Sequence, residues 1–166
     1  MINNRASIDY RLLLQQRQRL ACGLIIIDVD NFKLVNDNYG HLVGDRVLSE
    51  VGRLLRHITR NEDFAGRYGG EEFLVMTATY EPGTLISIAE RIRQEVEQCV
   101  MVLEDGRQLK VTVSLGVSLY LPGMVIRKAL KLADQALYQA KRQGKNQVIA
   151  SSILHFARLG DRAPKV

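Results

Sequence analysis

Residues 22–30, Cys-Gly-Leu-Ile-Ile-Ile-Asp-Val-Asp, join an unbroken apolar run to two carboxylates at its end. The run is too short for a typical helix and is rich in β-branched side chains, so it predicts a strand covered on both faces. A carboxylate directly after a buried strand is costly to place without a partner. This stretch therefore predicts a central strand that ends in a polar site formed around Asp28 and Asp30.

Helix and strand patterns alternate around this segment. Apolar residues at three- and four-residue spacing predict helices over about 47–58, 82–99 and 126–144. Helix-favouring Leu, Gln and Arg with few breakers predict another helix over about 7–20. Runs of β-forming residues predict strands over 63–68, 72–77, 111–120 and 147–150, with a short strand at 101–104. The Gly69-Gly70 and Asp105-Gly106 steps predict tight hairpin turns, because glycine tolerates positive φ. This order predicts an α+β fold, a ferredoxin-like β-α-β-β-α-β core followed by a C-terminal helix and strand.

Composition and charge limit the class of protein. The 166 residues, 46% of them hydrophobic, suit one domain over 1–150, with a partly ordered tail over 151–166. The longest apolar run is far below the roughly 20 residues of a membrane span, and no signal peptide opens the chain, which predicts no membrane contact. Cys22 and Cys99 lie in apolar patterns and are expected as reduced core residues, which fits the cytoplasm. The net charge of +5 suits nucleotides, nucleic acids and anionic lipids alike.

A second pair of carboxylates, Glu71 and Glu72, follows the Gly69-Gly70 turn. A hairpin docked beside the central strand would bring this pair within reach of Asp28. Mg²⁺ typically binds one or two carboxylates and completes its octahedron with water and phosphate oxygens, so the convergence predicts a Mg²⁺ site, with Mn²⁺ as an alternative ion, and phosphoryl chemistry. Taken singly, the same residues are equally well explained as a strand-end cap and an exposed turn.

Four sequence blocks follow one another between residues 28 and 148. They are DVDNFKLVNDNYGHLVGD at 28–45, RYGGEEF at 67–73, VTVSLGV at 111–117 and ADQALYQAKRQGKN at 133–146. In this order they resemble the GGDEF domain of diguanylate cyclases, the second block matching the family's name motif in its Glu-for-Asp form. The resemblance implies the fold that nucleotidyl cyclases share with polymerase palm domains.

The resemblance also implies roles for individual residues. Asp28, Glu71 and the carbonyl of Val29 would bind the metal, with Glu71 and Glu72 as the catalytic carboxylates. Asn36 and Asp45 would bind guanine, since a carboxylate accepts from the N1–H and the exocyclic amine that adenine lacks. The groups expected at the phosphates are the peptide N–H groups of Asn31 and Phe32, the Gly69-Gly70 turn, Lys33, Lys141 and Lys145. His41 is expected to serve the turn structurally, although an imidazole is an obvious general base.

The implied reaction joins two GTP molecules into cyclic di-GMP and releases two pyrophosphates. Each domain would bind one GTP, so a homodimer with two facing half-sites is expected. Arg60 and Asp63, spaced as in the family's Arg-x-x-Asp motif, would form an inhibitory site for the product, with Arg91 contributing. A sensory or dimerising domain is expected elsewhere in the parent protein.

Two departures from the family pattern stand out. Lys145 occupies a position that is usually Arg, which keeps the charge without the planar two-pronged contact. Asn4-Arg5 follows Met1 almost directly, where relatives carry a preceding segment, so the sequence predicts an N-terminally truncated domain that is monomeric and poorly active at low concentration.

Two other functional classes remain open. One is a catalytically silent receptor for GTP or cyclic di-GMP, against which the intact acidic and guanine-binding positions argue. The other is a nucleic-acid-binding domain, suggested by the positive charge and the ferredoxin-like pattern. The chain lacks an aromatic-basic strand motif, so no nucleic-acid partner is expected. For Lys141 and Lys145, the alternative is a pair of lysines that stabilise the C-terminal end of a helix dipole.

Overall fold

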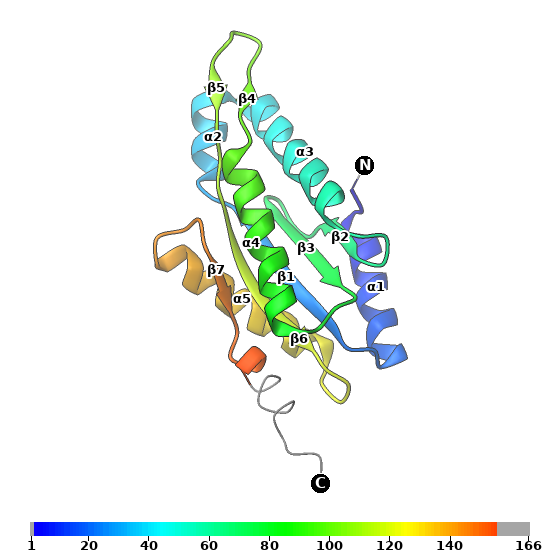
Figure 1. The fold of residues 1–166 in the computed structure, drawn as a ribbon. Coiled ribbons are helices and arrows are strands. Elements are labelled where there is room, and N and C mark those ends of the chain that lie inside the picture. Colours follow the sequence, from blue (N-terminus) through cyan, green and yellow to red (C-terminus); the bar gives the residue numbers. More distant parts are fainter. Residues whose placement is uncertain (1, 156–166) are drawn as a thin grey trace.

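The structure of the protein is a computed structural model that describes residues 2–155. Figure 1 shows the helices and strands in chain order. They are α1 Arg5–Gln18, β1 Cys22–Val29, α2 Phe32–Tyr39, α3 His41–Ile58, β2 Phe64–Arg67, β3 Glu72–Thr77, α4 Pro82–Gln98, β4 Met101–Val102, β5 Gln108–Leu109, β6 Val113–Tyr120, α5 Ile126–Arg142 and β7 Val148–Ala150.

The main sheet has the strand order β2-β3-β1-β6-β7. All neighbouring strands are antiparallel except β6 and β7, which are parallel. The first four strands in this order form the ferredoxin-like core, and β7 adds the fifth at one edge. The predicted α+β fold with a C-terminal helix and strand is therefore confirmed.

Both faces of β1 are buried, as the apolar run predicted. Ile25 and Ile27 belong to a core cluster that includes residues of α3 and α4 on one face of the sheet. Leu24 and Ile26 belong to a second cluster, on the other face, with residues of α1 and α5. Figure 1 shows the sheet between these two helical layers. Alternating side chains of β1 thus pack into two cores, one on each face of the sheet. This packing fixes the position of the end of β1 relative to the helices.

The close contact between α5 and β6 depends on Gly116. A Cβ atom at this position would lie 2.0 Å from the carbonyl oxygen of Ala133 and 2.4 Å from the backbone nitrogen of Leu137. Only glycine therefore lets α5 pack this close to the strand. The consequence is that the C-terminal turn of α5 lies over the end of β1.

Three local predictions need correction. The strand at 101–104 does not continue into the main sheet: β4 pairs with β5 in a separate two-stranded sheet, although Gly106 makes the predicted turn with φ of 83°. Helix α2 was not predicted. The Gly69-Gly70 hairpin exists, but neither glycine has positive φ; the backbone N–H groups of Tyr68 and Gly69 both donate to the carbonyl of Glu72. Neither backbone φ nor crowding requires glycine there: a Cβ atom at Gly70 would meet nothing within 4 Å, and one at Gly69 would meet only the Glu72 side chain.

The chain after β7 remains packed on the core for a few residues. The backbone N–H of Ser151 donates to the carbonyl of Val117, and Leu154 is only 3% exposed. The rest of the predicted tail, residues 156–166, lies outside the described residues. Cys22 is buried and Cys99 partly buried, and neither forms a disulfide. No helix within residues 2–155 has both the length and the apolar character needed to cross a membrane.

Candidate active site at the end of β1

The β1–β3 register brings the two acidic pairs together. Asp28 is the cross-strand partner of Glu72, and the backbone N–H of Val29 donates to the carbonyl of Glu71 at 3.2 Å. The hairpin therefore docks beside the central strand as the sequence predicted. Its turn places three carboxylates around the end of β1.

The electrostatics of this cluster favour a cation. Burial, and then the charge of Asp28, raise the pKa of Glu71 and of Glu72 above the ordinary value. Burial also raises the pKa of Asp28, although the ammonium of Lys141 lies 2.6 Å from its Oδ1 atom. Oxygen ligands of this type suit Mg²⁺ or Mn²⁺, so the donor set fits a hard divalent ion. Within residues 2–155 no three His, Cys, Asp or Glu side chains are already arranged as a metal site.

Asp30 lies in a different environment from Asp28. Its side chain is buried and accepts from the hydroxyl groups of Ser114 at 2.6 Å and Thr112 at 2.7 Å. The ammonium of Lys141 lies 3.0 Å from its Oδ1. Burial alone would raise the pKa of Asp30, but these hydrogen bonds and the ammonium hold it below the ordinary value. Asp30 is therefore a fully bonded carboxylate that fixes neighbouring groups.

A pocket of about 520 Å³ opens beside the acidic cluster. Its lining includes six residues with predicted roles: Phe32, Lys33, Asn36, Asp45, Gly70 and Glu71. His41, Leu48 and Arg67 complete it and had no predicted site role. Arg67 donates to the carbonyl of Gly70 from Nε at 3.0 Å and from Nη2 at 2.6 Å, so it shapes the hairpin turn. Its position two residues before the glycine pair is a signal that could have identified it.

The placement of Asn36 in this pocket depends on Gly44. A Cβ atom at Gly44 would lie 2.0 Å from the side-chain oxygen of Asn36. The contact between α2 and α3 thus leaves room for the amide and sets it beside Asp45, which follows Gly44 in α3. Within residues 2–155 the side chains of Lys33, Asn36 and Asp45 make no hydrogen bond or ion pair with the protein.

Some of the predicted phosphate-binding groups lie together at the start of α2. Asn31 precedes the helix with a left-handed backbone, and no side chain caps the helix there. The ammonium of Lys145 donates to Oδ1 of Asn31 at 2.6 Å. Backbone N–H groups at a helix start attract anions, and a nearby ammonium adds to that attraction. Lys141 differs, since its ammonium lies on Asp28 and Asp30.

The residues predicted for product inhibition lie away from this pocket. Asp63 accepts from the backbone N–H of Arg60 and of Ala78, both at 3.0 Å, so its two oxygens already stabilise the turn after α3. The Arg60 side chain is 76% exposed. Arg91 lies exposed on α4, and within residues 2–155 no hydrogen bond or ion pair joins it to the other two.

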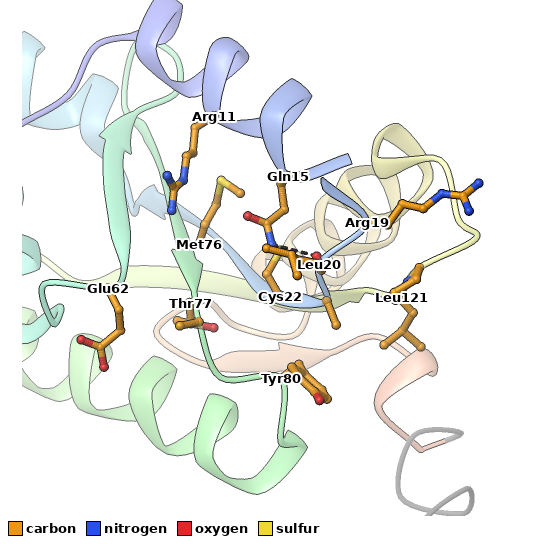
Figure 2. Close-up of a pocket in the computed structure, with 13 residues that line it drawn as sticks. Arg11, Gln15, Arg19, Leu20, Cys22, Glu62, Met76, Thr77, Tyr80 and Leu121 are labelled. Carbon is orange, nitrogen blue, oxygen red and sulfur yellow. Dashed lines mark hydrogen bonds between the residues drawn. The ribbon is translucent and has the colours of Figure 1, made fainter. Parts of the chain in front are cut away.

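Another pocket, of about 580 Å³, lies at the opposite end of the sheet. It is lined by side chains from α1, from the start of β1 and from the end of β3, among them Arg11, Cys22 and Met76, as Figure 2 shows. None of the residues predicted for metal or GTP binding lines it. The two pockets are therefore separated by the length of β1.

The comparisons with known proteins agree with this geometry. Residues 1–147 match the family model described as "Diguanylate cyclase, GGDEF domain". The chain is 44% identical over 129 residues to diguanylate cyclase A of Treponema denticola, which covers 77% of this chain and 34% of the relative. It is 35% identical over 125 residues to diguanylate cyclase DosC of Escherichia coli, covering 75% of this chain and 27% of that protein. The chain thus spans about a third of these relatives' length.

Two solved structures also match this chain in fold and in sequence. The GGDEF domain of DgcB from Caulobacter crescentus, in complex with c-di-GMP, matches with a TM-score of 0.83 and 31% identity, over 90% of this chain and 91% of that one. The active GGEEF domain of a diguanylate cyclase from Vibrio cholerae matches with a TM-score of 0.80 and 33% identity, over 91% of this chain and 98% of that one.

Proposed function

The chain belongs to the GGDEF domain family of diguanylate cyclases, and from this membership we propose that it condenses two GTP molecules into cyclic di-GMP. The observation that carries the proposal is the single pocket that joins Asn36 and Asp45 to Glu71. It offers a polar surface for a base at one end and a carboxylate at the other, so one nucleotide can span both.

The guanine base of GTP would bind unpaired polar groups of the pocket. Asp45 accepts from N1–H and the exocyclic amine of guanine, and the Asn36 amide supplies complementary bonds. The triphosphate lies toward the start of α2, where the N–H groups of Asn31 and Phe32 and the ammonium of Lys33 face it. Lys145, Lys141 and the Gly69-Gly70 turn surround the remaining phosphate oxygens.

Asp28 and Glu71, with the carbonyl of Val29, would hold Mg²⁺ or Mn²⁺. When bound, the ion polarises the phosphate and lowers the pKa of the attacking hydroxyl. Glu71 lines the pocket next to Asp28, and burial together with the charge of Asp28 raises its pKa in the metal-free protein. We assign Glu71 to accept the proton of the 3′-hydroxyl, with Glu72 supporting the negative charge of the site.

In each step the 3′-hydroxyl oxygen of one GTP attacks the α-phosphorus of the other, and the bond to the β-phosphate bridging oxygen breaks. Pyrophosphate leaves, and a second equivalent step closes the ring. One chain that binds one GTP supplies only half of this arrangement, so two chains must face each other. Specific activity is then expected to rise with enzyme concentration.

Three further features complete the proposal. Cyclic di-GMP inhibits the cyclase reaction by binding at Arg60, Asp63 and Arg91. A sensory or dimerising domain controls the assembly, and the structure of diguanylate cyclase SiaD with its activator SiaC shows that one relative has a protein activator. The expected location is the cytoplasm, which fractionation of cells would test.

The direct test is incubation of concentrated protein with GTP and Mg²⁺, followed by chromatography for cyclic di-GMP and pyrophosphate. Wild type should form both, in a ratio of one to two, and Glu71→Ala should form neither. GTP binding without product would instead support the silent receptor. Binding of RNA in place of GTP would support the nucleic-acid class.

A further inference from the structure

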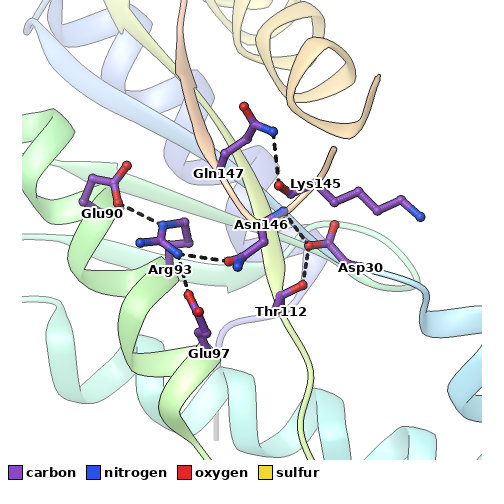
Figure 3. Close-up of polar contacts among 8 residues, drawn as sticks. All are labelled: Asp30, Glu90, Arg93, Glu97, Thr112, Lys145, Asn146 and Gln147. Carbon is purple, nitrogen blue, oxygen red and sulfur yellow. Dashed lines mark hydrogen bonds and ion pairs between the residues drawn. The ribbon is translucent and has the colours of Figure 1, made fainter. Parts of the chain in front are cut away.

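Resting on the proposed function, we infer that Arg93 and Asn146 are positioning residues for the triphosphate. Neither side chain lines the nucleotide pocket. Together with Asp30 they fix the turn between α5 and β7, and this turn holds the ammonium of Lys145 at the start of α2. Figure 3 shows Arg93, Asn146 and Asp30 joined by hydrogen bonds, with Lys145 next to Asn146 in the turn.

The turn has an unusual backbone that needs support. Gly144, Lys145 and Asn146 have φ values of 119°, 63° and 47°. Three consecutive left-handed residues, two of them with side chains, are costly, so the surroundings must hold them. Lys145 is the middle residue of this run: its backbone N–H donates to the carbonyl of Ala140, and its ammonium donates to the side-chain oxygen of Asn31.

Asp30 provides the first support. Its Oδ2 accepts from the backbone N–H of Asn146 at 3.0 Å, in addition to the Thr112 hydroxyl. Its Oδ1 accepts from Ser114 and lies next to the ammonium of Lys141. One buried carboxylate therefore ties the turn to β6 and to α5.

Arg93 provides the second support from α4. Its Nη1 donates to the side-chain oxygen of Asn146 at 3.1 Å. Ion pairs with Glu90 and Glu97 hold the guanidinium from both sides, and the Arg93 side chain is only 17% exposed. Because these ion pairs already hold the Arg93 guanidinium in place, its hydrogen bond to Asn146 costs little additional conformational entropy. The geometry of Lys145 thus depends on a helix that does not contact the nucleotide.

Two substitutions isolate this contact. Asn146→Gly removes the side chain and keeps a residue that accepts positive φ. Arg93→Met keeps an unbranched apolar side chain and removes the guanidinium group. Arg53→Met is the matched control, because Arg53 forms the same type of i,i+3 pair, with Glu50, on α3. The double variant Arg93→Met/Asn146→Gly shows whether the two residues act through each other.

The readout is the equilibrium dissociation constant, with Mg²⁺, for a GTP analogue carrying an α,β-methylene bridge, compared with that for GMP. Each single variant should weaken analogue binding about three- to tenfold, as expected for one lost hydrogen bond, and change GMP binding less than twofold. The double variant should have the same dissociation constant for the analogue as whichever single variant binds it more weakly. Arg53→Met should bind both nucleotides like wild type.

Four results would overturn the inference. The first is that both single variants bind the analogue as tightly as wild type, and the second is that they lose affinity for GMP and the analogue by the same factor. The third is that the losses of the two single variants add up in the double variant, and the fourth is that Arg53→Met loses as much affinity for the analogue as Arg93→Met. Failure of wild type to bind either nucleotide would instead contradict the proposed function, and this inference with it.

Discussion

The two sides of the β1 end differ in how their polar groups are bonded. On the open flank, formed by Lys33, Asn36 and Asp45 of α2 and α3, no side chain pairs with another described residue. On the bonded flank, formed by Asp30, Lys141 and Asn146, every side chain has a hydrogen bond or an ion pair. The open flank lies on two helices, whereas on the bonded flank only Lys141 lies in a helix; Asp30 follows β1, and Asn146 lies in the turn before β7.

The two flanks therefore have different roles: one is available for ligand binding, and the other stabilises the structure. An unpaired polar group at the surface is kept solvated and available, so a ligand can bond it without first breaking a protein contact. A buried, fully bonded group cannot be removed cheaply, because its partners lose their bonds too. Substitutions on the open flank should therefore affect binding and catalysis, and those on the bonded flank should first affect stability.

The largest expected effect is at Glu71, which lines the same pocket as the open flank. Glu71→Gln keeps the shape and removes both the proposed base and a charged metal ligand, so the rate of cyclic di-GMP formation should fall by about 10³-fold. The melting temperature should remain near that of wild type. Glu104→Gln, on the exposed β4–β5 connection, is the control and should retain wild-type activity. A large loss of stability in Glu71→Gln would break the comparison.

The next effect is a loss of stability at Asp30. Asp30→Asn removes a charge that Lys141 and two hydroxyl groups stabilise, and should lower the free energy of unfolding by about 3 kcal/mol at pH 7. Because the folded pKa of Asp30 lies below its ordinary value of 3.8, its contribution is complete above that value and is lost as the pH falls through the folded pKa. The difference between wild type and variant should therefore shrink in acid.

Urea unfolding between pH 3 and pH 7 measures this difference. Asp105→Asn is a suitable control: hydrogen bonds from Arg107 lower the pKa of Asp105 as well, but this residue is fully exposed. Its replacement should change stability little at any pH. A difference between wild type and Asp30→Asn that stays constant down to pH 3 would be inconsistent with a titrating Asp30.

A smaller effect is expected for guanine selection. Asn36→Ala should weaken GTP binding by up to about tenfold and leave ATP binding nearly unchanged, since one amide is lost from the base site. Gly44→Ala should give a similar change with Asn36 intact, because the new methyl group must displace the amide. Isothermal titration with both nucleotides measures this, and Asp37→Asn on the same helix is the control. Equal losses for GTP and ATP would count against a guanine site.

The smallest effect concerns product inhibition, which depends on neither flank. Arg60→Ala should raise the cyclic di-GMP concentration for half-inhibition by about fivefold, because an exposed ion pair contributes about 1 kcal/mol. Arg56→Ala, on the exposed face of α3, is the control. Inhibition curves for both variants give the comparison, and overlapping curves would place the inhibitory site elsewhere.

The sequence predicted the fold well where one local pattern dominated. The apolar run at 24–27, the spacing of Val47 to Ile58 and the hairpin around Gly69-Gly70 each have one structural solution. Helix α2 escaped prediction, because its Asn-Asp-Asn segment at 36–38 has low helix propensity and its formation depends on contacts with α3. The pairing of β4 with β5 was missed although its turn was predicted, because the two residues of β5, Gln108 and Leu109, are too few to give a strand pattern.

Site prediction was limited in another way. The family motifs named Asn36, Asp45, Glu71 and Lys145, and the structure places the first three around one pocket. The bonds of Asp30 to Thr112, Ser114 and Asn146 join residues more than 80 positions apart, and no local pattern encodes them. For the same reason Arg93 gave no signal beyond that of a charged helix face.

Gly116 has an effect that reaches beyond its own packing. Since α5 rests on β6 with no room for one more carbon, the residue sets the distance from the helix to the sheet and hence the reach of the Lys141 amine. A methyl group there would lift the helix and separate the amine from Asp28, leaving neighbouring negative charges unscreened. A residue without any functional group, deep in the interior, thus controls the charge balance that an incoming metal nucleotide meets.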